Sequence, residues 1–144
     1  MKNVFIYADG ACRGNPGPGG YGVILKFNDS IKKIKGAMKK TTNNKMEMTA
    51  AIEGLKALKE PCHVTLISDS NYLIQGMNRW IHVWLKKGWW TYNKMPVKNR
   101  ELWEELVNLS KQHKIKWKWI RGHSNHPENE MADRLANEAI DELT

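Results

Sequence analysis

An apolar run near the amino terminus consists of Val4-Phe5-Ile6-Tyr7-Ala8 and stops at an aspartate, Asp9. Consecutive apolar and β-favouring residues are typical of a strand that is buried on both faces. A turn cluster, Asn15-Pro16-Gly17-Pro18-Gly19-Gly20, follows a few residues later. The sequence therefore predicts a buried first strand with a carboxylate at its end.

The next segments predict two more strands and then a helix. Strands over 21–27 and 31–38 flank the turn Asn28-Asp29-Ser30, so the chain opens with an antiparallel meander. Apolar residues then recur at helical spacing between 48 and 58, after the cap region Thr41-Thr42-Asn43-Asn44. We expect Pro61 to end that helix.

The second half of the chain alternates strands with helices. We expect a strand over 64–67, a helix capped within Ser68-Asp69-Ser70 and reaching about residue 78, and a helix around 102–109. Lysines alternate with apolar residues over 114–119, as in a half-exposed edge strand, and Pro127 opens a last helix. Such alternation favours parallel pairing, and sites in such sheets lie beyond the carboxyl ends of the strands.

Composition limits the class of protein. The 144 residues fit one domain with a hydrophobic core, and the net charge of +8 suits a polyanion such as nucleic acid or an anionic membrane surface, although a basic protein need not bind either. Cys12 and Cys62 form no CxxC pair, which indicates free thiols in a reducing compartment. The amino-terminal residues resemble neither a signal peptide nor a membrane span, so we expect a cytoplasmic protein.

Four carboxylates stand out by position: Asp9, Glu47, Asp69 and Asp133. Each also has an ordinary structural interpretation. Asp69 could cap a helix, Glu47 could close a capping box from Asn44 or favour the helix dipole, and Asp133 could be a solvated charge. Asp9 is harder to explain in this way, because aspartate is depleted in strands.

The neighbours of these acids favour a metal site. Glu47 and Asp133 have no lysine or arginine at helical spacing, so a local salt bridge explains neither. Clustered acids without cations repel one another and must take up protons or bind metal. Hard carboxylate oxygens favour Mg²⁺ or Mn²⁺, and no Cys/His spacing fits zinc.

Several runs carry a resemblance to type 1 ribonuclease H, the bacterial ribonuclease HI form. They extend over essentially the whole chain: Tyr7-Ala8-Asp9-Gly10, then 14–22, then Thr41-Thr42-Asn43-Asn44-Lys45-Met46-Glu47, then Ser68-Asp69-Ser70, then 122–130 with Asp133 three residues on. The resemblance implies a ribonuclease H-like α/β fold. Its five-stranded mixed sheet has an antiparallel meander of strands 1–3, parallel strands 1, 4 and 5, and helices on both faces.

The resemblance also implies an activity, which is hydrolysis of the RNA strand of RNA–DNA hybrids to give 5′-phosphate and 3′-hydroxyl ends. Asp9, Glu47, Asp69 and Asp133 would bind two Mg²⁺, with Mn²⁺ as a substitute, and His123 matches a mobile histidine that helps proton transfer or product release. Taken without the family, a histidine in a Gly-His-Ser loop is more often a surface residue. We expect a monomer.

Residues 71–99 contain no acid and interleave lysines and arginines with tryptophans. This suits nucleic acid, although a solvated basic surface over a tryptophan-bearing core is the alternative, with Trp80 and Trp84 at helical spacing. By resemblance, 79–100 is a basic protrusion on a single domain, 1–144. The substrate-binding residues that the resemblance implies are Cys12, Asn15, Lys40, Thr42, Asn43, Asn44, Asn71, Trp80, Trp84, Lys86, Lys87, Lys94 and Asn99.

Within this set, the resemblance places Cys12, Asn15 and Asn71 near the RNA strand and Asn43 and Asn44 in the minor groove. A pocket for a DNA phosphate would consist of Lys40, Thr42 and Asn99. Lysine at position 40 and asparagine at 71 depart from the arginine and glutamine common in the family, which bears on affinity.

Other functions remain open at this stage. A non-catalytic hybrid- or duplex-binding module would need the basic stretch but not the four acids. A different nuclease or an integrase can use the same fold, because fold does not determine function. A general DNA-coating protein would leave Asp9 unexplained.

Overall fold

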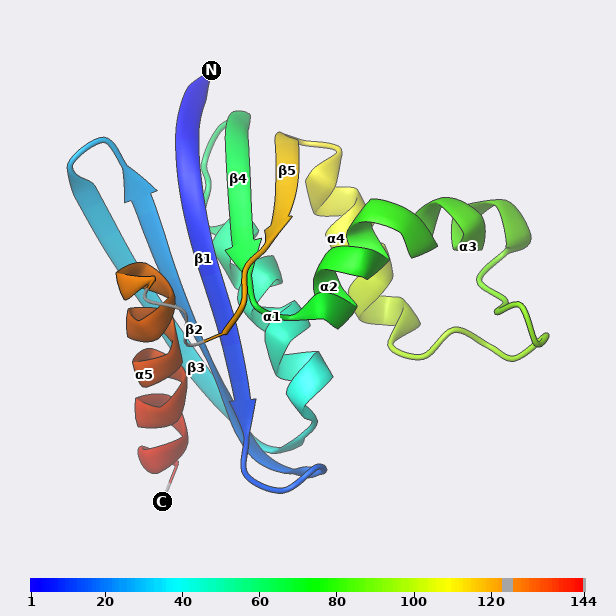
Figure 1. The fold of residues 1–144 in the computed structure, drawn as a ribbon, viewed down its shortest axis with the longest axis horizontal. Coiled ribbons are helices and arrows are strands. Elements are labelled where there is room, and N and C mark those ends of the chain that lie inside the picture. Colours follow the sequence, from blue (N-terminus) through cyan, green and yellow to red (C-terminus); the bar gives the residue numbers. More distant parts are fainter. Residues whose placement is uncertain (123–125, 144) are drawn as a thin grey trace.

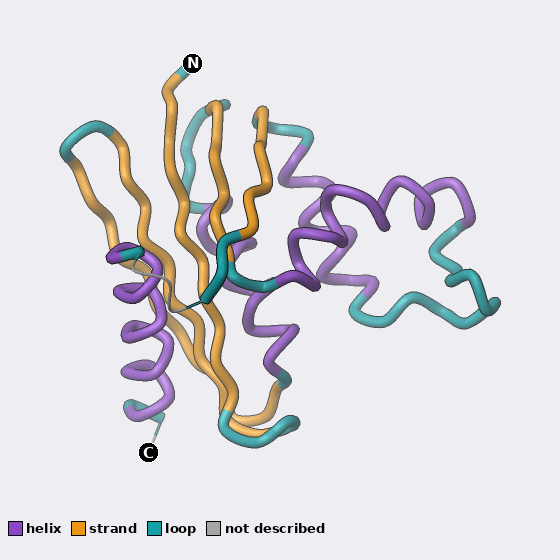
Figure 2. The backbone as a smooth tube through the Cα atoms, viewed as in Figure 1, coloured by secondary structure: helices purple, strands orange, loops and turns teal. Residues whose placement is uncertain are grey.

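The structure, a computed structural model, describes residues 1–122 and 126–143. Its sheet has five strands in the order β3-β2-β1-β4-β5 (Figures 1 and 2). The strands are β1 Lys2–Cys12, β2 Gly17–Phe27, β3 Ser30–Thr41, β4 Cys62–Ser68 and β5 Lys114–Trp119. The pairs β1–β2 and β2–β3 are antiparallel, and β1–β4 and β4–β5 are parallel. The predicted mixed sheet, with the first strand at its centre, is confirmed.

Helices lie on both faces of this sheet. They are α1 Asn43–Lys56, α2 Asn71–Gln75, the π-helical turn η1 Gly76–Trp80, α3 Ile81–Lys87, α4 Arg100–Ser110 and α5 Pro127–Asp141. Helix α5 packs on β2, β1 and β3 from one side, and α1 packs on the same strands from the other, with α4 beside it (Figure 1). No helix among the described residues is long and apolar enough to cross a membrane.

Several boundaries differ from the predicted ones. Strand β1 continues through Asp9 to Cys12, because residues 9–12 pair with Gly19–Gly22 of β2, and this tertiary pairing overrides the weak strand preference of aspartate and glycine. Helix α1 ends at Lys56, before Pro61. Its N-cap is Thr42, whose hydroxyl accepts a hydrogen bond from the Lys45 N–H at 3.2 Å.

The helical segment after β4 reaches Lys87 instead of residue 78, since α2, η1 and α3 follow one another without a break. Aromatic packing explains the extension. The Trp80 ring lies 5.8 Å from Tyr72, and the Trp84 ring lies 5.5 Å from Trp103, which is fully buried. Gly88 then ends the segment in the left-handed conformation, with φ of 69°, where a glycine is least strained.

The parallel part of the sheet ends just before the predicted acids. Strands β1 and β4 pair as far as Tyr7 and Ile67, and only β2 continues beside β1 beyond that point. Asp9 and Asp69 therefore both lie just beyond the end of the pairing between β1 and β4. This is the arrangement that leaves their side chains room to converge.

Helix α5 approaches β2 closely because two glycines face it. A Cβ atom on Gly22 would lie 2.1 Å from the carbonyl oxygen of Ala132, and one on Gly20 would lie 2.2 Å from that of Ala136. No real Cβ atom tolerates such a contact with backbone. The glycines of β2 thus set the distance between the sheet and the helix that carries Asp133.

We expect Gly22→Ala to lower the free energy of unfolding by about 1–3 kcal/mol, since the added methyl group must push α5 off the sheet. The exposed Lys33 on β3 provides a control, and Lys33→Ala should change stability by no more than about 0.5 kcal/mol. Urea denaturation followed by circular dichroism measures both. An unchanged midpoint for Gly22→Ala would show that α5 does not press on β2.

Candidate active site

Asp9 lies in the middle strand, opposite Gly22 of β2, and is only 4% exposed. Its side chain projects on the same face of β1 as Tyr7, two residues earlier. A buried carboxylate without a partner is costly, so its surroundings must compensate for it.

Glu47 approaches from α1, on the fifth residue of that helix, and is also 4% exposed. Glu47 therefore lies beyond the first turn, where the helix dipole does not account for it, and the capping box from Asn44 is excluded because Thr42 is the cap. The backbone N–H of Gly10 donates a hydrogen bond to Glu47 Oε1. A Cβ atom on Gly10 would lie 2.5 Å from the Glu47 nitrogen, so glycine is needed for α1 to come this close.

Asp69 directly follows β4 and is partly buried. The helix-capping interpretation of Asp69 is wrong. Ser70 is the N-cap of α2, and its hydroxyl accepts from the Leu73 N–H at 3.2 Å. The Asp69 side chain is left for another role, while its backbone oxygen accepts a hydrogen bond from Trp119 Nε1 at 3.1 Å.

These three acids converge, because one carboxylate oxygen from each of Asp9, Glu47 and Asp69 lies within 4.8 Å of the others. Within the described residues, no lysine or arginine forms an ion pair with any of them. Burial raises the pKa of Asp9 strongly, and the charges of Glu47, Asp69 and Asp133 raise it further. Burial, followed by the charge of Asp69, also raises the pKa of Glu47, although the Gly10 N–H opposes this.

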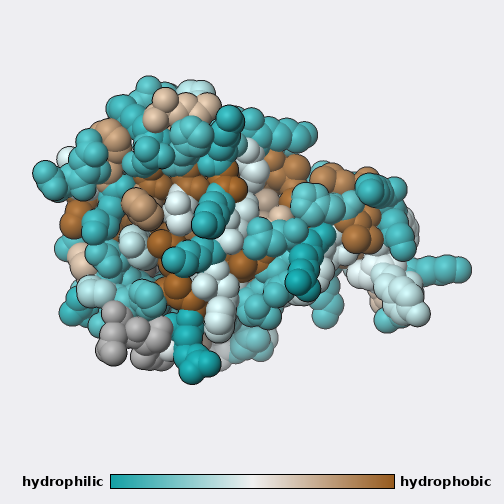
Figure 3. Space-filling model, turned by 45° about the horizontal axis from the view of Figure 1, so that its top comes forward, coloured by the Kyte–Doolittle hydropathy of each residue, from teal (hydrophilic) through white to brown (hydrophobic). Residues whose placement is uncertain are grey.

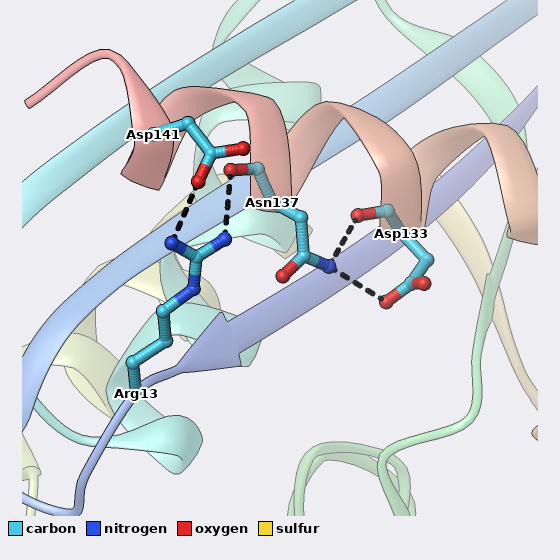
Figure 4. A network of polar contacts seen from close by, with 4 residues as sticks. All are labelled: Arg13, Asp133, Asn137 and Asp141. Atoms are coloured by element: carbon cyan, nitrogen blue, oxygen red, sulfur yellow. Dashed lines mark hydrogen bonds and ion pairs between the residues drawn. The ribbon is translucent and has the colours of Figure 1, made fainter.

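Asp133 joins the group from α5. After burial and the charges of Glu47 and Asp69, it raises the pKa of Asp9 further through a side-chain hydrogen bond and through its charge. The amide nitrogen of Asn137, one turn later, donates to the Asp133 backbone oxygen at 3.0 Å and reaches Oδ1 at 3.5 Å (Figure 4). Asn137 thus restrains the Asp133 carboxylate.

A loop fastens this part of α5 to the sheet. Arg13, just after β1, forms an ion pair with Asp141 at 2.6 Å and donates to the Asn137 carbonyl oxygen at 3.4 Å (Figure 4). Sequence patterns did not indicate Arg13, Asn137 or the Gly10 contact. Only Gly10 had a sequence signal, since it follows Asp9 directly, whereas Arg13 and Asn137 are 124 residues apart.

The acidic group fits a divalent cation. Its donors are carboxylate oxygens, which are the ligands preferred by Mg²⁺ and Mn²⁺, and two of the carboxyl groups are buried without a compensating charge from the described residues. A bound cation would favour the charged carboxylates, whose pKa values burial and mutual repulsion raise. Asp9, Glu47 and Asp69 are the residues that could hold it, with Asp133 adjacent.

Comparisons with known proteins decide the family. The family model described as RNase H matches residues 1–141. The chain belongs to the ribonuclease H family. A protein of Geotalea uraniireducens named Ribonuclease H is 58% identical over 138 residues, covering 96% of this chain and 94% of that protein. One of the same name from Coxiella burnetii is 56% identical over 140 residues, covering 97% and 91%.

Solved structures agree with the family assignment. The chain superposes on LC9-RNase H1, described as a type 1 RNase H with the type 2 active-site motif, with a TM-score of 0.90 and 33% identity, over 100% of this chain and 74% of the other. The amino-terminal RNase H domain of a Mycobacterium tuberculosis protein gives a TM-score of 0.76 and 28% identity, over 99% and 96%. The predicted resemblance to type 1 ribonuclease H is confirmed.

Two of the predicted substrate-binding loops contact each other. The side-chain oxygen of Asn15 accepts a hydrogen bond from the Asn43 N–H at 2.9 Å, which joins the loop after β1 to the start of α1. Asn43 is exposed and Asn44 is partly buried beside it. Cys12 is partly buried, and its sulfur donates to the Gly14 carbonyl oxygen at 2.7 Å.

The structure brings together two of the three residues predicted for a phosphate pocket. A cleft of about 510 Å³ is lined by Lys40, Asn99 and Thr41, whereas Thr42 is absent from its lining and caps α1 instead. The Asn99 amide donates to the Tyr72 hydroxyl at 3.1 Å, which fixes one wall of the cleft.

The predicted protrusion combines an aromatic core with exposed cations. Trp84 contacts the rings of Trp80, Trp89 and Trp103, so core packing accounts for both Trp80 and Trp84, and their contact with substrate stays a prediction. The predicted binding residues Asn71, Lys86, Lys87 and Lys94 are all exposed. His123 lies outside the described residues.

We expect Asp9→Asn to raise the melting temperature of the metal-free protein at neutral pH. The pKa of Asp9 is raised above its ordinary 3.8, so the folded wild type holds protons that the unfolded chain releases, and its stability falls as the pH rises above about 4. A gain of roughly 1–3 kcal/mol in the free energy of unfolding corresponds to removing an excess of about tenfold to a hundredfold in the proton affinity of Asp9 in the folded protein. Calorimetry in EDTA between pH 4 and 9 measures it.

Asp29→Asn is the matched control, because Asp29 is an exposed turn residue. The control should keep the wild-type dependence of stability on pH, whereas Asp9→Asn should flatten it. Equal profiles for Asp9→Asn and the wild type would mean that Asp9 is not destabilised by its neighbours.

Proposed function

We propose that this protein is a divalent-metal-dependent endonuclease that hydrolyses the RNA strand of RNA–DNA hybrids and leaves 5′-phosphate and 3′-hydroxyl ends. The observation that carries the proposal is the convergence of Asp9, Glu47 and Asp69 without a compensating cation among the described residues. Membership of the ribonuclease H family, with curated relatives of that name, supports the hybrid as substrate.

In this proposal, Asp9, Glu47, Asp69 and Asp133 hold two Mg²⁺ ions, with Mn²⁺ as a substitute. When bound, these ions supply an activated water and stabilise the charge that develops on the leaving 3′ oxygen. The residues of the chain position this chemistry: the Gly10 N–H orients the carboxylate of Glu47, and Asn137 orients that of Asp133. His123 would transfer protons or assist product release.

Substrate recognition would use three regions around the acids. Asn15, Asn43 and Asn44, together with Cys12, would contact the minor groove and the RNA strand, where 2′-hydroxyls distinguish the two strands. The cleft lined by Lys40 and Asn99 would take a DNA phosphate. The protrusion would grip the DNA strand further along through its exposed lysines.

We expect Asp9→Asn and Asp69→Asn each to abolish cleavage in Mg²⁺ while leaving the fold intact, because each removes a metal ligand and a repulsive charge. The assay compares labelled RNA–DNA hybrid, double-stranded RNA and single-stranded RNA, each with and without Mg²⁺. Asp29→Asn should cleave the hybrid at the wild-type rate. Turnover at the wild-type rate by either active-site variant would contradict the metal assignment.

The same assay distinguishes this proposal from the main alternative, which is a non-catalytic module that binds hybrids or duplexes. Such a module would bind the hybrid with or without Mg²⁺ and leave it intact. Cleavage of double-stranded RNA as well as hybrid would instead indicate a nuclease of another specificity.

The triple substitution Lys86→Ala, Lys87→Ala and Lys94→Ala should raise KM for the hybrid and leave kcat nearly unchanged, because these lysines lie outside the acidic cluster and contact ground and transition states alike. Each lost phosphate contact should also reduce the log–log dependence of affinity on salt by about one unit. Binding across a salt series, with steady-state cleavage, measures both effects. If the variant kept the wild-type salt slope and KM, these lysines would not contact the substrate, and the protrusion would be only a solvated surface.

A further inference from the structure

The face of the sheet that carries α5 is only partly covered. Helix α5 lies over β2, β1 and β3, and Figure 1 shows β4 and β5 beside it without a helix in front of them. Alternation along the strands places Phe5 and Tyr7 of β1 on this open face, and the β4 and β5 residues paired beside them share it. Phe5 is 45% exposed, although it stands in the central strand of the sheet.

Strand register arranges this face in rows. Phe5 pairs with Thr65, which pairs with Lys116, and Tyr7 pairs with Ile67, which pairs with Lys118. A third row, nearer the start of the strands, consists of Asn3, His63 and Lys114. Each of the first two rows therefore leads from an aromatic ring on β1 to a lysine on the edge strand β5. We call these three rows the aromatic–lysine face.

The cations of this face are not used by the fold. Within the described part of the chain, Lys114, Lys116 and Lys118 form no ion pair, and all three are exposed. By contrast, Lys26, on the other side of Phe5, pairs with Glu128 at 2.9 Å. The uncompensated charge is thus confined to the β5 side, where alternate lysines follow one another at about 7 Å.

The face is also hollowed. A cleft of about 420 Å³ runs between β1 and β5 and is lined by residues that include Phe5, Thr65 and Lys116. In Figure 3, apolar surface lies between hydrophilic side chains on the side of the molecule that α5 leaves open. Lysines on an edge strand protect against aggregation, which explains β5 by itself. That role does not explain an exposed phenylalanine in the middle strand.

We propose that the aromatic–lysine face binds single-stranded nucleic acid, with bases stacked on Phe5 and Tyr7 and phosphates at Lys116 and Lys118. Rings on an open sheet face beside a row of cations provide the two interactions that single strands require, which are stacking and backbone neutralisation. An acidic peptide would use the lysines but would gain little from the exposed ring of Phe5. This surface is separate from the protrusion, which extends away from the sheet beyond β5 (Figure 1).

The face leads to the acidic cluster, since Phe5, Tyr7 and Asp9 are alternate residues on one side of β1. A single strand held there would enter or leave the cluster along β1. The proposal does not depend on catalysis, because it concerns binding of a strand that need not be cleaved.

Binding of a fluorescein-labelled oligothymidylate of about 15 nucleotides, measured by anisotropy in EDTA, tests the proposal. Phe5→Thr, which keeps a strand-favouring residue, should weaken binding about tenfold, and Phe5→Tyr should retain wild-type affinity. Lys116→Gln with Lys118→Gln should reduce the log–log salt dependence by about 1.4, or about 0.7 for each phosphate contact. The same charge change at Lys32 and Lys33, on the opposite edge strand β3, should leave the slope unchanged.

Three results would overturn the proposal: wild-type affinity in Phe5→Thr, an equal loss of slope in the β3 control, or equally tight and Phe5-dependent binding of an acidic oligopeptide. Circular dichroism establishes that each variant is folded, and the lysine pair remains informative if Phe5→Thr is not. Failure here leaves the nuclease proposal intact, because the measurement involves neither metal nor cleavage.

Discussion

Repulsion among buried carboxylates is the constraint on which the rest of the structure depends. Asp9 and Glu47 are each 4% exposed, with oxygens within 4.8 Å of one another and of Asp69, and no cation of the described chain pairs with them. The fold holds them together through contacts made elsewhere. Those contacts include the buried faces of β1 and α1 and the single N–H that Gly10 supplies to Glu47. The protein thus maintains an unfavourable cluster of carboxylates that a divalent ion would stabilise.

Glycine makes this convergence possible from two directions. Gly10 lets the start of α1 approach β1, and Gly20 and Gly22 let α5 approach β2, in each case at a distance that a Cβ atom would prevent. The two helices bring Glu47 and Asp133 to the same end of β1 from opposite faces of the sheet. The side chain of Asn137 and the ion pair between Arg13 and Asp141 then fix α5 in place (Figure 4).

The exposed positive charge lies outside the acidic cluster, on several separate elements. The exposed lysines of the protrusion and of β5 lie on separate elements, while Lys26 and Lys35 are neutralised by glutamates of the carboxyl-terminal segment. A polyanion would therefore be attracted to the protein over a wide surface, while the buried acids would accept it only together with metal. On the proposed function, affinity and chemistry would rest on different residues, so that either could change without the other.

The sequence by itself determined the order of the strands and helices and the identity of the acids. Apolar runs and alternation predicted every strand, and helical spacing predicted the helices. The placement of Asp9 and Asp69 after neighbouring parallel strands predicted that they meet. Position alone left Glu47 and Asp133 with ordinary interpretations, because a helical acid is usually a solvated charge, and the family motifs gave both of them a role in the site.

Tertiary structure alone decided the rest. The extension of β1 through Asp9 depends on pairing with β2, and the length of the segment ending at Lys87 depends on the rings of Trp80 and Trp84 packing on Tyr72 and Trp103. Thr42 and Ser70 cap α1 and α2, so neither Glu47 nor Asp69 is used in capping. Several neighbouring residues could cap each helix by their chemistry, and only the backbone geometry of the fold selects these two. The contact of Arg13 with Asp141 joins residues far apart in the chain, and local patterns carry no information about such partners, since only folding brings them together.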